Sequence, residues 1–155
     1  MITRFDRLDR AIVRWMSGNG ITALRLSLGI VFLWFGVLKY FPHMSPAETL
    51  ASDTILVLTL GHIGPHISLP ILATWECLIG LGLLTGTAKR ATLFLLFAQM
   101  LGTLFPLFFF PARTFSVVPF VPTLEGQYII KNLVLISAGI VIGATVRGGS
   151  AHDRV

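Results

Sequence analysis

Four ionisable side chains interrupt the long apolar runs of this 155-residue chain: Arg25, Lys39, Glu76 and Lys131. An ionisable group inside hydrocarbon costs at least a few kcal/mol, so such groups usually pair with one another or line a polar pathway. Glu76 stands near the middle of its run and cannot reach an interface easily. It therefore needs a cationic partner, or it must take up a proton.

Lys39 and Lys131 lie at a similar depth to each other and close to that of Glu76, which allows a Lys–Glu–Lys cluster in the outer half of a bundle. Lysines polarise a carbonyl or bind an anion, and a carboxyl group exchanges a proton with a ligand that is being reduced. Tyr128 and Asn132 are four residues apart and share a helical face on which they could orient the cluster or a ligand. We assign a catalytic role to Glu76 and ligand-binding roles to Lys39, Tyr128, Lys131 and Asn132. The alternative is a buried ion pair that only holds helices together.

Other polar residues of these runs have structural explanations beside functional ones. Arg25 shares a face with Lys39 and either snorkels toward the inner interface or serves a site. Gln99 and Thr103 favour hydrogen bonding between helices. Cys77 is best explained as a small buried side chain. A single cysteine excludes an internal disulfide, a four-cysteine zinc site and an iron–sulfur cluster held by this chain alone.

The histidines give weak support for a metal site. His62 and His66 are four residues apart, but the intervening glycine and proline disfavour a continuous helix, and ligation together with His43 needs a folded loop. We therefore predict no metal. Phosphate-binding loops, dinucleotide fingerprints, nucleophile elbows and HExxH motifs are absent from the sequence.

The composition indicates a chain that resides in a bilayer. Hydrophobic residues make up 54% and charged residues 12%, against about 25% charged residues in soluble domains. The mean hydropathy is +0.82. Four apolar runs are long enough to cross about 30 Å of hydrocarbon as helices. They cover about 21–41, 67–86, 91–110 and 127–146.

These runs predict an all-α fold, an integral membrane four-helix bundle that forms a single membrane domain over residues 1–155. Pro106 predicts a kink near the end of the third span. Gly139 and Gly143 form a GxxxG pattern, which fits packing inside the bundle or a homo-oligomer equally well.

Basic residues gather on one side of the predicted topology, which explains the net charge of +5 without nucleic-acid binding. A single arginine, Arg113, lies in a loop on the other side. By the positive-inside rule, both termini are cytoplasmic, and we expect a bacterial inner (plasma) membrane. The residues on the cytoplasmic side are Arg4, Arg7, Arg10, Arg14, Lys89, Arg90, Arg147 and Arg154.

Three segments outside the spans have their own patterns. Within 1–18, residues 2–16 predict an amphipathic interfacial helix that ends at Gly18 and Gly20. The outer segment 42–66 predicts a short extracytoplasmic helix at about 46–60, begun by Ser45 and Pro46 with Glu48 completing a capping box. The outer segment 111–126, with three prolines, predicts an ordered, irregular loop.

Two glycine-spaced patterns together resemble the DoxX/DoxD-like family of small four-helix membrane proteins, over about residues 22–146. The long outer segments and the Lys131–Asn132 pair depart from the family pattern. The first pattern comprises Arg25, Gly29, Phe32, Gly36 and Lys39. The second comprises Glu76, Gly80, Leu83, Leu84, Gly86 and Arg90.

The resemblance implies association with membrane oxidoreductase assemblies, such as thiosulfate:quinone oxidoreductase, and hence a protein partner. The leading hypothesis is an inner-membrane subunit of a redox assembly that holds a quinone or a small sulfur anion in an outer-half pocket, with no intrinsic cofactor. The alternatives are a non-catalytic scaffold or assembly factor and, with less support, a small-molecule carrier. Whether the chain is itself an enzyme stays open.

Overall fold

The computed structural model describes residues 4–41, 44–45 and 48–146. It contains four helices that are long and apolar enough to cross a membrane, as predicted. The long helices are α1 (Arg4–Leu38), α3 (Pro65–Thr85), α4 (Lys89–Leu104) and α7 (Leu124–Ala144). The shorter elements are α2 (Glu48–Leu58), α5 (Pro106–Phe109), α6 (Pro111–Thr114), β1 (Phe115–Val117) and β2 (Val121–Pro122).

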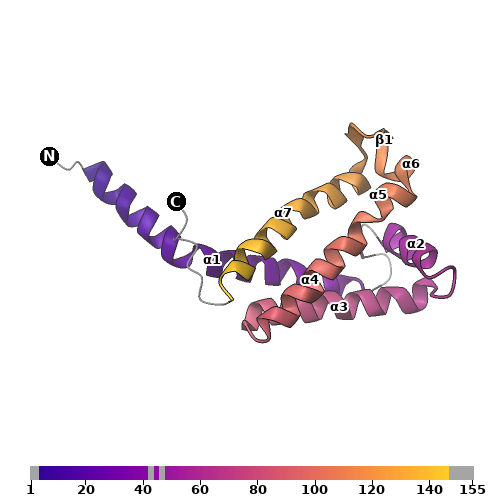
Figure 1. The fold of residues 1–155 in the computed structure, drawn as a ribbon, viewed down its shortest axis with the longest axis horizontal. Helices are drawn as coiled ribbons and strands as arrows, with labels where there is room; N and C mark the ends of the chain where they lie inside the picture. Colours follow the sequence, from indigo (N-terminus) through magenta and orange to yellow (C-terminus); the bar gives the residue numbers. More distant parts are fainter. Residues whose placement is uncertain (1–3, 42–43, 46–47, 147–155) are drawn as a thin grey trace.

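The long helices alternate in direction. Figure 1 shows the start of α1, the connection between α3 and α4 and the end of α7 toward one end of the molecule. Helices α2, α5 and α6 and the small hairpin lie toward the other end. An even number of crossings follows from this arrangement, so both ends of the described chain lie on the same side of the bundle.

The prediction of a helix break at Gly18 and Gly20 is wrong, because α1 continues through both glycines as one 35-residue helix. A glycine costs a helix only about 1 kcal/mol. The neighbouring polar side chains also bond to the helix's own carbonyls instead of redirecting the chain: Ser17 Oγ to Arg14 O and Asn19 Nδ2 to Trp15 O. The described side chains before Ile21 are all exposed, so this part of α1 forms an arm beside the bundle.

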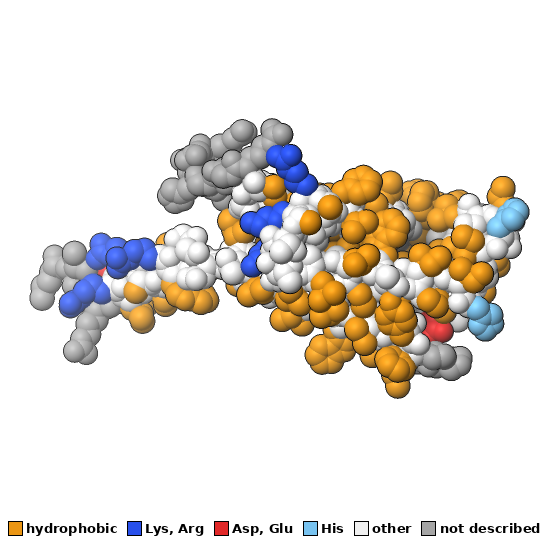
Figure 2. Space-filling model, turned by 90° about the horizontal axis from the view of Figure 1, so that it is seen from below, with side chains coloured by type: hydrophobic (Ala, Val, Ile, Leu, Met, Phe, Trp, Pro, Cys, Tyr) orange, Lys and Arg blue, Asp and Glu red, His pale blue; other side chains and the backbone are white. Residues whose placement is uncertain are grey.

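The arm and the bundle have different surfaces. Figure 2 shows Lys and Arg side chains along one edge of the arm and at the adjoining end of the bundle. Hydrophobic side chains cover the opposite edge of the arm and most of the bundle face in view. Parts of the predicted pattern, including Pro46, His43, Arg147 and Arg154, lie outside the described residues.

The segments around the third span are partly as predicted. The kink expected at Pro106 is confirmed, since α4 ends at Leu104 and α5 begins at Pro106. A helix also forms inside the predicted range 46–60, as α2. The irregular loop predicted for 111–126 instead holds one helical turn and an antiparallel pair of strands, β1 and β2. The β-branched and aromatic residues around its prolines account for this hairpin.

Helices α1 and α3 pack with their backbones in close approach. An added Cβ at Gly80 would lie 2.5 Å from the Leu33 nitrogen, and one at Gly36 would lie 2.9 Å from the Cys77 nitrogen. A Cβ at Gly29 would likewise lie 3.1 Å from the Gly80 carbonyl oxygen. Small residues let helix backbones approach in this way. The contact fixes the register of α1 on α3.

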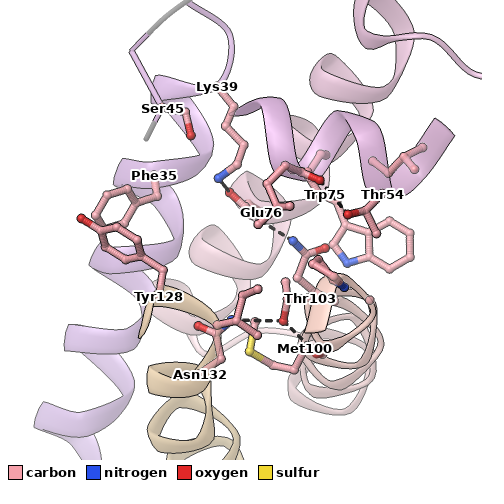
Figure 3. Close-up of a pocket in the computed structure, with 18 of the residues that line it drawn as sticks. Phe35, Lys39, Ser45, Thr54, Trp75, Glu76, Met100, Thr103, Tyr128 and Asn132 are labelled. Atoms are coloured by element: carbon pink, nitrogen blue, oxygen red, sulfur yellow. Dashed lines mark hydrogen bonds and ion pairs between the residues drawn. The ribbon is translucent and has the colours of Figure 1, made fainter. Parts of the chain in front are cut away.

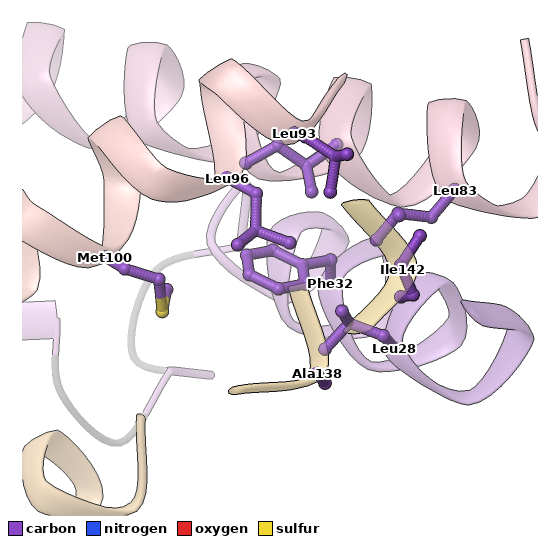
Figure 4. Close-up of a cluster of buried hydrophobic side chains, with 9 residues drawn as sticks. Leu28, Phe32, Leu83, Leu93, Leu96, Met100, Ala138 and Ile142 are labelled. Carbon is purple, nitrogen blue, oxygen red and sulfur yellow. The ribbon is translucent and has the colours of Figure 1, made fainter. Parts of the chain in front are cut away.

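A tightly packed cluster fills the half of the bundle toward the α1 arm, and we call this region the packed half. Ile79 and Leu96 are 0% exposed, and Gly139 packs against Leu96 and Phe97 of α4. The GxxxG pattern thus serves packing inside the bundle. Figure 4 shows the cluster, which consists of Leu28, Phe32, Ile79, Leu83, Leu93, Leu96, Met100, Ala138 and Ile142.

Candidate functional site

The centre of the site is an ion pair between α3 and the end of α1. Lys39 Nζ lies 2.5 Å from Glu76 Oε2, and the two side chains are only 11% and 10% exposed. Gln99 of α4 donates from Nε2 to the other carboxylate oxygen, Oε1, at 2.9 Å. Glu76 therefore has one partner just beyond the end of α1 and another in α4. The predicted need of Glu76 for a cationic partner is confirmed.

The α1–α3 packing places these groups. Lys39 is the first residue after α1, and its backbone N–H donates to the Gly36 carbonyl. A Cβ on Gly36 would lie 3.0 Å from Glu76 Cβ, so this glycine brings the two backbones together one turn before Lys39. The lysine side chain then needs to cross only a short gap to the carboxylate.

A second polar link joins α4 and α7. Asn132 Nδ2 donates to Thr103 Oγ1 at 3.1 Å, and this hydroxyl donates to the Met100 carbonyl at 2.8 Å. The bonding between helices predicted for Gln99 and Thr103 is therefore present. Both residues also line a cavity.

The cavity has a volume of about 490 Å³, large enough for a small organic ligand. It lies in the half of the bundle away from the arm, which we call the cavity half. Figure 3 shows Lys39, Glu76, Thr103 and Asn132 around it, with Phe35 and Tyr128 at one side. Four of the five predicted site residues line this cavity: Lys39, Glu76, Tyr128 and Asn132.

Lys131 is not brought into the cluster. Its side chain is exposed, and its Nζ lies 5.7 Å from the centre of the Tyr128 ring in a cation–π contact. The prediction of a Lys–Glu–Lys cluster is therefore wrong for Lys131. Gln99 is the second residue that bonds to Glu76. The depth of a residue along its helix does not fix the direction in which its side chain faces.

Arg25 hydrogen-bonds to the C-terminal end of α3 and does not line the cavity. Its Nη1 donates to the Leu83 and Leu84 carbonyls, at 3.0 Å for Leu84. The last carbonyls of a helix have no partner within the helix, and a cation there also favours the helix dipole. The guanidinium thus supports the end of α3 next to Gly86, whose φ is 70°.

Helix α2 closes one end of the cavity and is held by Arg113. Arg113 Nη1 lies 2.7 Å from Asp53 Oδ2, and Nη2 lies 3.1 Å from Glu125 Oε1 and 3.2 Å from Thr49 Oγ1. The hydrogen bond to Glu125, followed by the one to Asp53, raises the pKa of Arg113 further above its usual range. One guanidinium therefore ties α2 to the first turn of α7.

From the sequence, the helix that became α2 was predicted, but Trp75 and the α2 side chains that line the cavity were missed. Trp75 lines the cavity and anchors α3 to α4 by donating from Nε1 to the Leu95 carbonyl at 3.0 Å. Its position next to Glu76 was a usable signal. The α2 wall residues carried no such signal, because apolar and small side chains of this kind occur in any helix that packs on a bundle: Leu50, Ala51, Thr54, Ile55 and Leu58.

The remaining candidates do not form a centre. Within the described residues, no group of three His, Cys, Asp or Glu side chains is arranged to hold a metal ion. Cys77 is a free, partly exposed thiol beside Gly36 and does not line the cavity.

The fold and the site together define a helical protein with four candidate membrane spans and a largely apolar cavity that contains a buried, hydrogen-bonded ion pair. No protein-family model, curated protein or solved structure matches the chain.

Proposed function

We propose that this chain is a membrane subunit of a redox assembly that binds a quinone or a small sulfur anion in the cavity. The observation that carries the proposal is the Lys39–Glu76 pair at the cavity wall. Charges inside a spanning helix are costly and usually functional. A pair needed only to join helices has no reason to border an open volume.

The chemistry of the pair suits a ligand with carbonyl oxygens. An ammonium has three donors, so Lys39 can bond to Glu76 and still donate to a ligand oxygen. When the ligand is reduced, Glu76 can take up a proton from the aqueous phase and pass it to that oxygen, which returns the side chain to a carboxylate paired with Lys39. Electrons come from a partner protein of the assembly, which makes this chain the binding subunit.

The proposal extends to membership of the DoxX/DoxD-like family. Support comes from the role of the shared pattern in this fold: Gly29, Gly36 and Gly80 make the α1–α3 contact, and Arg25 completes α3. These are the residues on which the resemblance rests.

We also propose an orientation in a bacterial plasma membrane. The arginine-bearing arm of α1 lies at the inner leaflet, with its hydrophobic edge toward the lipid. Helix α2 and the hairpin then lie on the extracytoplasmic side, and both termini are cytoplasmic. The separation of basic side chains toward the arm end of the molecule supports this orientation (Figure 2).

A scaffold or assembly factor is the second candidate. The Lys39–Glu76–Gln99 group connects α1, α3 and α4, and a role in specifying how helices pair would use the same contacts. In that case the cavity has no specific ligand.

The test is native mass spectrometry of the detergent-purified protein, with organic extraction of whatever co-purifies. Wild type, Glu76→Gln and the matched exposed-charge variant Lys131→Gln are compared after thermal melts confirm that each is folded. We expect a bound quinone or sulfur anion in wild type and Lys131→Gln, and its loss in Glu76→Gln. A folded wild type that carries phospholipid alone would favour the scaffold function.

A further inference from the structure

The charged side chains of the cavity wall do not suit a small anion. The wall contains one cation, Lys39, and two carboxylates, Glu76 and Glu125. Lys39 is already paired with Glu76. Arg113 is not a wall residue but bonds to Glu125. If Arg113 is counted as well, its charge and that of Lys39 only balance the two carboxylates of the wall. A dianion entering this space would lose its hydration without gaining an unpaired cation.

The exposed part of the wall is entirely apolar or aromatic. Its exposed side chains are Val31 at 39%, Phe35 at 46%, Leu58 at 44%, Ile71 at 52% and Tyr128 at 44%. Every other polar or charged residue of the wall is buried or half-buried. Among the described residues, the exposed part of the wall therefore suits a ligand that arrives from lipid better than one that arrives from water.

Helices α1 and α7 both border the cavity, and each contributes an exposed aromatic side chain to its wall. In the packed half these helices meet through Phe32, Ala138 and Ile142. In the cavity half, Phe35 of α1 and Tyr128 of α7 both line the cavity and are both exposed, as Figure 3 shows at one side of the space. We call this exposed part of the wall, between Phe35 and Tyr128, the α1–α7 mouth.

The end of the cavity away from the packed half is covered by α2. The buried side of this helix, with Leu50 at 2% and Thr54 at 4% exposed, faces the cavity. Arg113 fastens the cover through Asp53 of α2 and Glu125 of α7. Passage from the aqueous side would have to displace this helix.

We infer that the ligand of the cavity is an uncharged amphiphile dissolved in the bilayer, which enters sideways through the α1–α7 mouth. This inference rests on the proposed function and chooses between its two ligand classes. The apolar body of the ligand occupies the volume between Phe35 and Trp75, and its polar oxygen reaches Lys39. Small anions in the aqueous phase are not ligands of this site.

The experiment uses Trp75 as the reporter, since it lines the cavity. The other two tryptophans, Trp15 and Trp34, are 64% and 66% exposed and lie outside the wall, so both are changed to Phe. Cys77→Ala completes the parent protein, which is reconstituted in lipid nanodiscs. The probes are a short-chain ubiquinone, which quenches tryptophan fluorescence, and thiosulfate as a competitor.

Two paired-cysteine variants of the parent close one route each, with a flexible bis-maleimide reagent. Phe35→Cys/Tyr128→Cys closes the α1–α7 mouth, and Asp53→Cys/Glu125→Cys fixes α2 over the cavity. Each protein is compared with itself before cross-linking, so any loss of stability from the substitutions cancels.

We expect saturable quenching of Trp75 that thiosulfate does not reverse. Closing the mouth should slow quenching by about tenfold or more, whereas fixing α2 should leave the rate unchanged. Reversal by thiosulfate, or slowing only when α2 is fixed, would overturn the inference but leave the proposed function standing. Absence of any saturable effect of either probe on the folded parent would overturn both.

Discussion

The two halves of the bundle use the same helices for opposite purposes. In the packed half, apolar side chains with almost no exposure fill the space between α1, α3, α4 and α7. In the cavity half, these helices surround about 490 Å³ of open volume, and polar groups bond across it. The comparison indicates that close packing and open volume are separated along the helix axes.

The α1–α3 contact is the feature common to both halves. Gly29 and Gly80 lie beside the packed cluster, and Gly36 lies beside Glu76. The register set by close packing in one half thus determines where the ion pair forms in the other. Substitutions in the ion pair, in the packed cluster and at the α1–α3 contact therefore measure how much each half contributes to stability.

The largest effect is expected from Lys39→Met, which leaves Glu76 without its cation. Removing one partner of a buried pair costs about 3–5 kcal/mol. The free energy of unfolding, from denaturant titration in detergent, should fall by that amount. The double variant Lys39→Met/Glu76→Gln should recover most of the loss, because it buries no unpaired charge.

Lys131→Met is the matched control, since Lys131 is exposed and lies outside the cavity wall. It should change stability by no more than about 0.5 kcal/mol. Equal losses of unfolding free energy for Lys39→Met and Lys131→Met would show that the Lys39–Glu76 pair contributes no more to stability than an exposed lysine does.

The next effect tests the packed half. Leu96→Ala removes a side chain that is 0% exposed and leaves a void. A loss of about 2–3 kcal/mol is expected, at the low end for such changes, because lipid tails are as apolar as leucine and only packing is lost. Val31→Ala, on the exposed cavity wall, should cost far less. Comparable losses would mean that the two halves are equally well packed.

A smaller effect should come from Gly80→Ala. The new Cβ would meet the Leu33 backbone at 2.5 Å, so α1 and α3 must move apart, at a cost of about 1–3 kcal/mol. Gly102→Ala is the control, because a Cβ there has open space, and it should be neutral or slightly stabilising. If the melting temperatures of Gly80→Ala and Gly102→Ala fell by the same amount, the close α1–α3 contact would be refuted.

The smallest effect on stability is expected from Arg113→Gln, about 1 kcal/mol or less, because its ion pairs are partly exposed. Its consequence should be local. Hydrogen exchange followed by mass spectrometry should show faster exchange in α2, with the packed half unchanged. Arg90→Gln, an exposed arginine at the opposite end, should leave α2 protection as it is.

The sequence predicted those features that follow from the chemistry of a bilayer. Apolar length located the four spans, and the cost of an intramembrane carboxylate predicted that Glu76 has a cationic partner or carries a proton, of which the structure shows the cationic partner. The direction of Lys131 was not predictable in the same way, because depth along a helix does not determine which neighbour a residue faces. The docking of α2 was also hidden, since it depends on Arg113, 60 residues from Asp53 along the chain.

The continuity of α1 shows the limit of local signals. Gly18 and Gly20 are weak helix formers, yet each costs only about 1 kcal/mol, and the side chains around them bond back to the helix. A break at that point needs a competing contact. Outside the bundle no other described element packs on the arm to provide one, as its exposure shows.

The ion pair also imposes an order on biosynthesis. Glu76 leaves the ribosome 37 residues after Lys39, so α1 is complete before the carboxylate of α3 is made. Lys39, at the end of its helix, can wait at an interface with its ammonium in water. Glu76, in the middle of α3, is too far from either interface for its carboxylate to stay in water. Without α1 in place, α3 would need a protonated Glu76 to enter the membrane. Against α1 it can keep a charged carboxylate, so α1 can serve as a template for the insertion of the rest of the bundle.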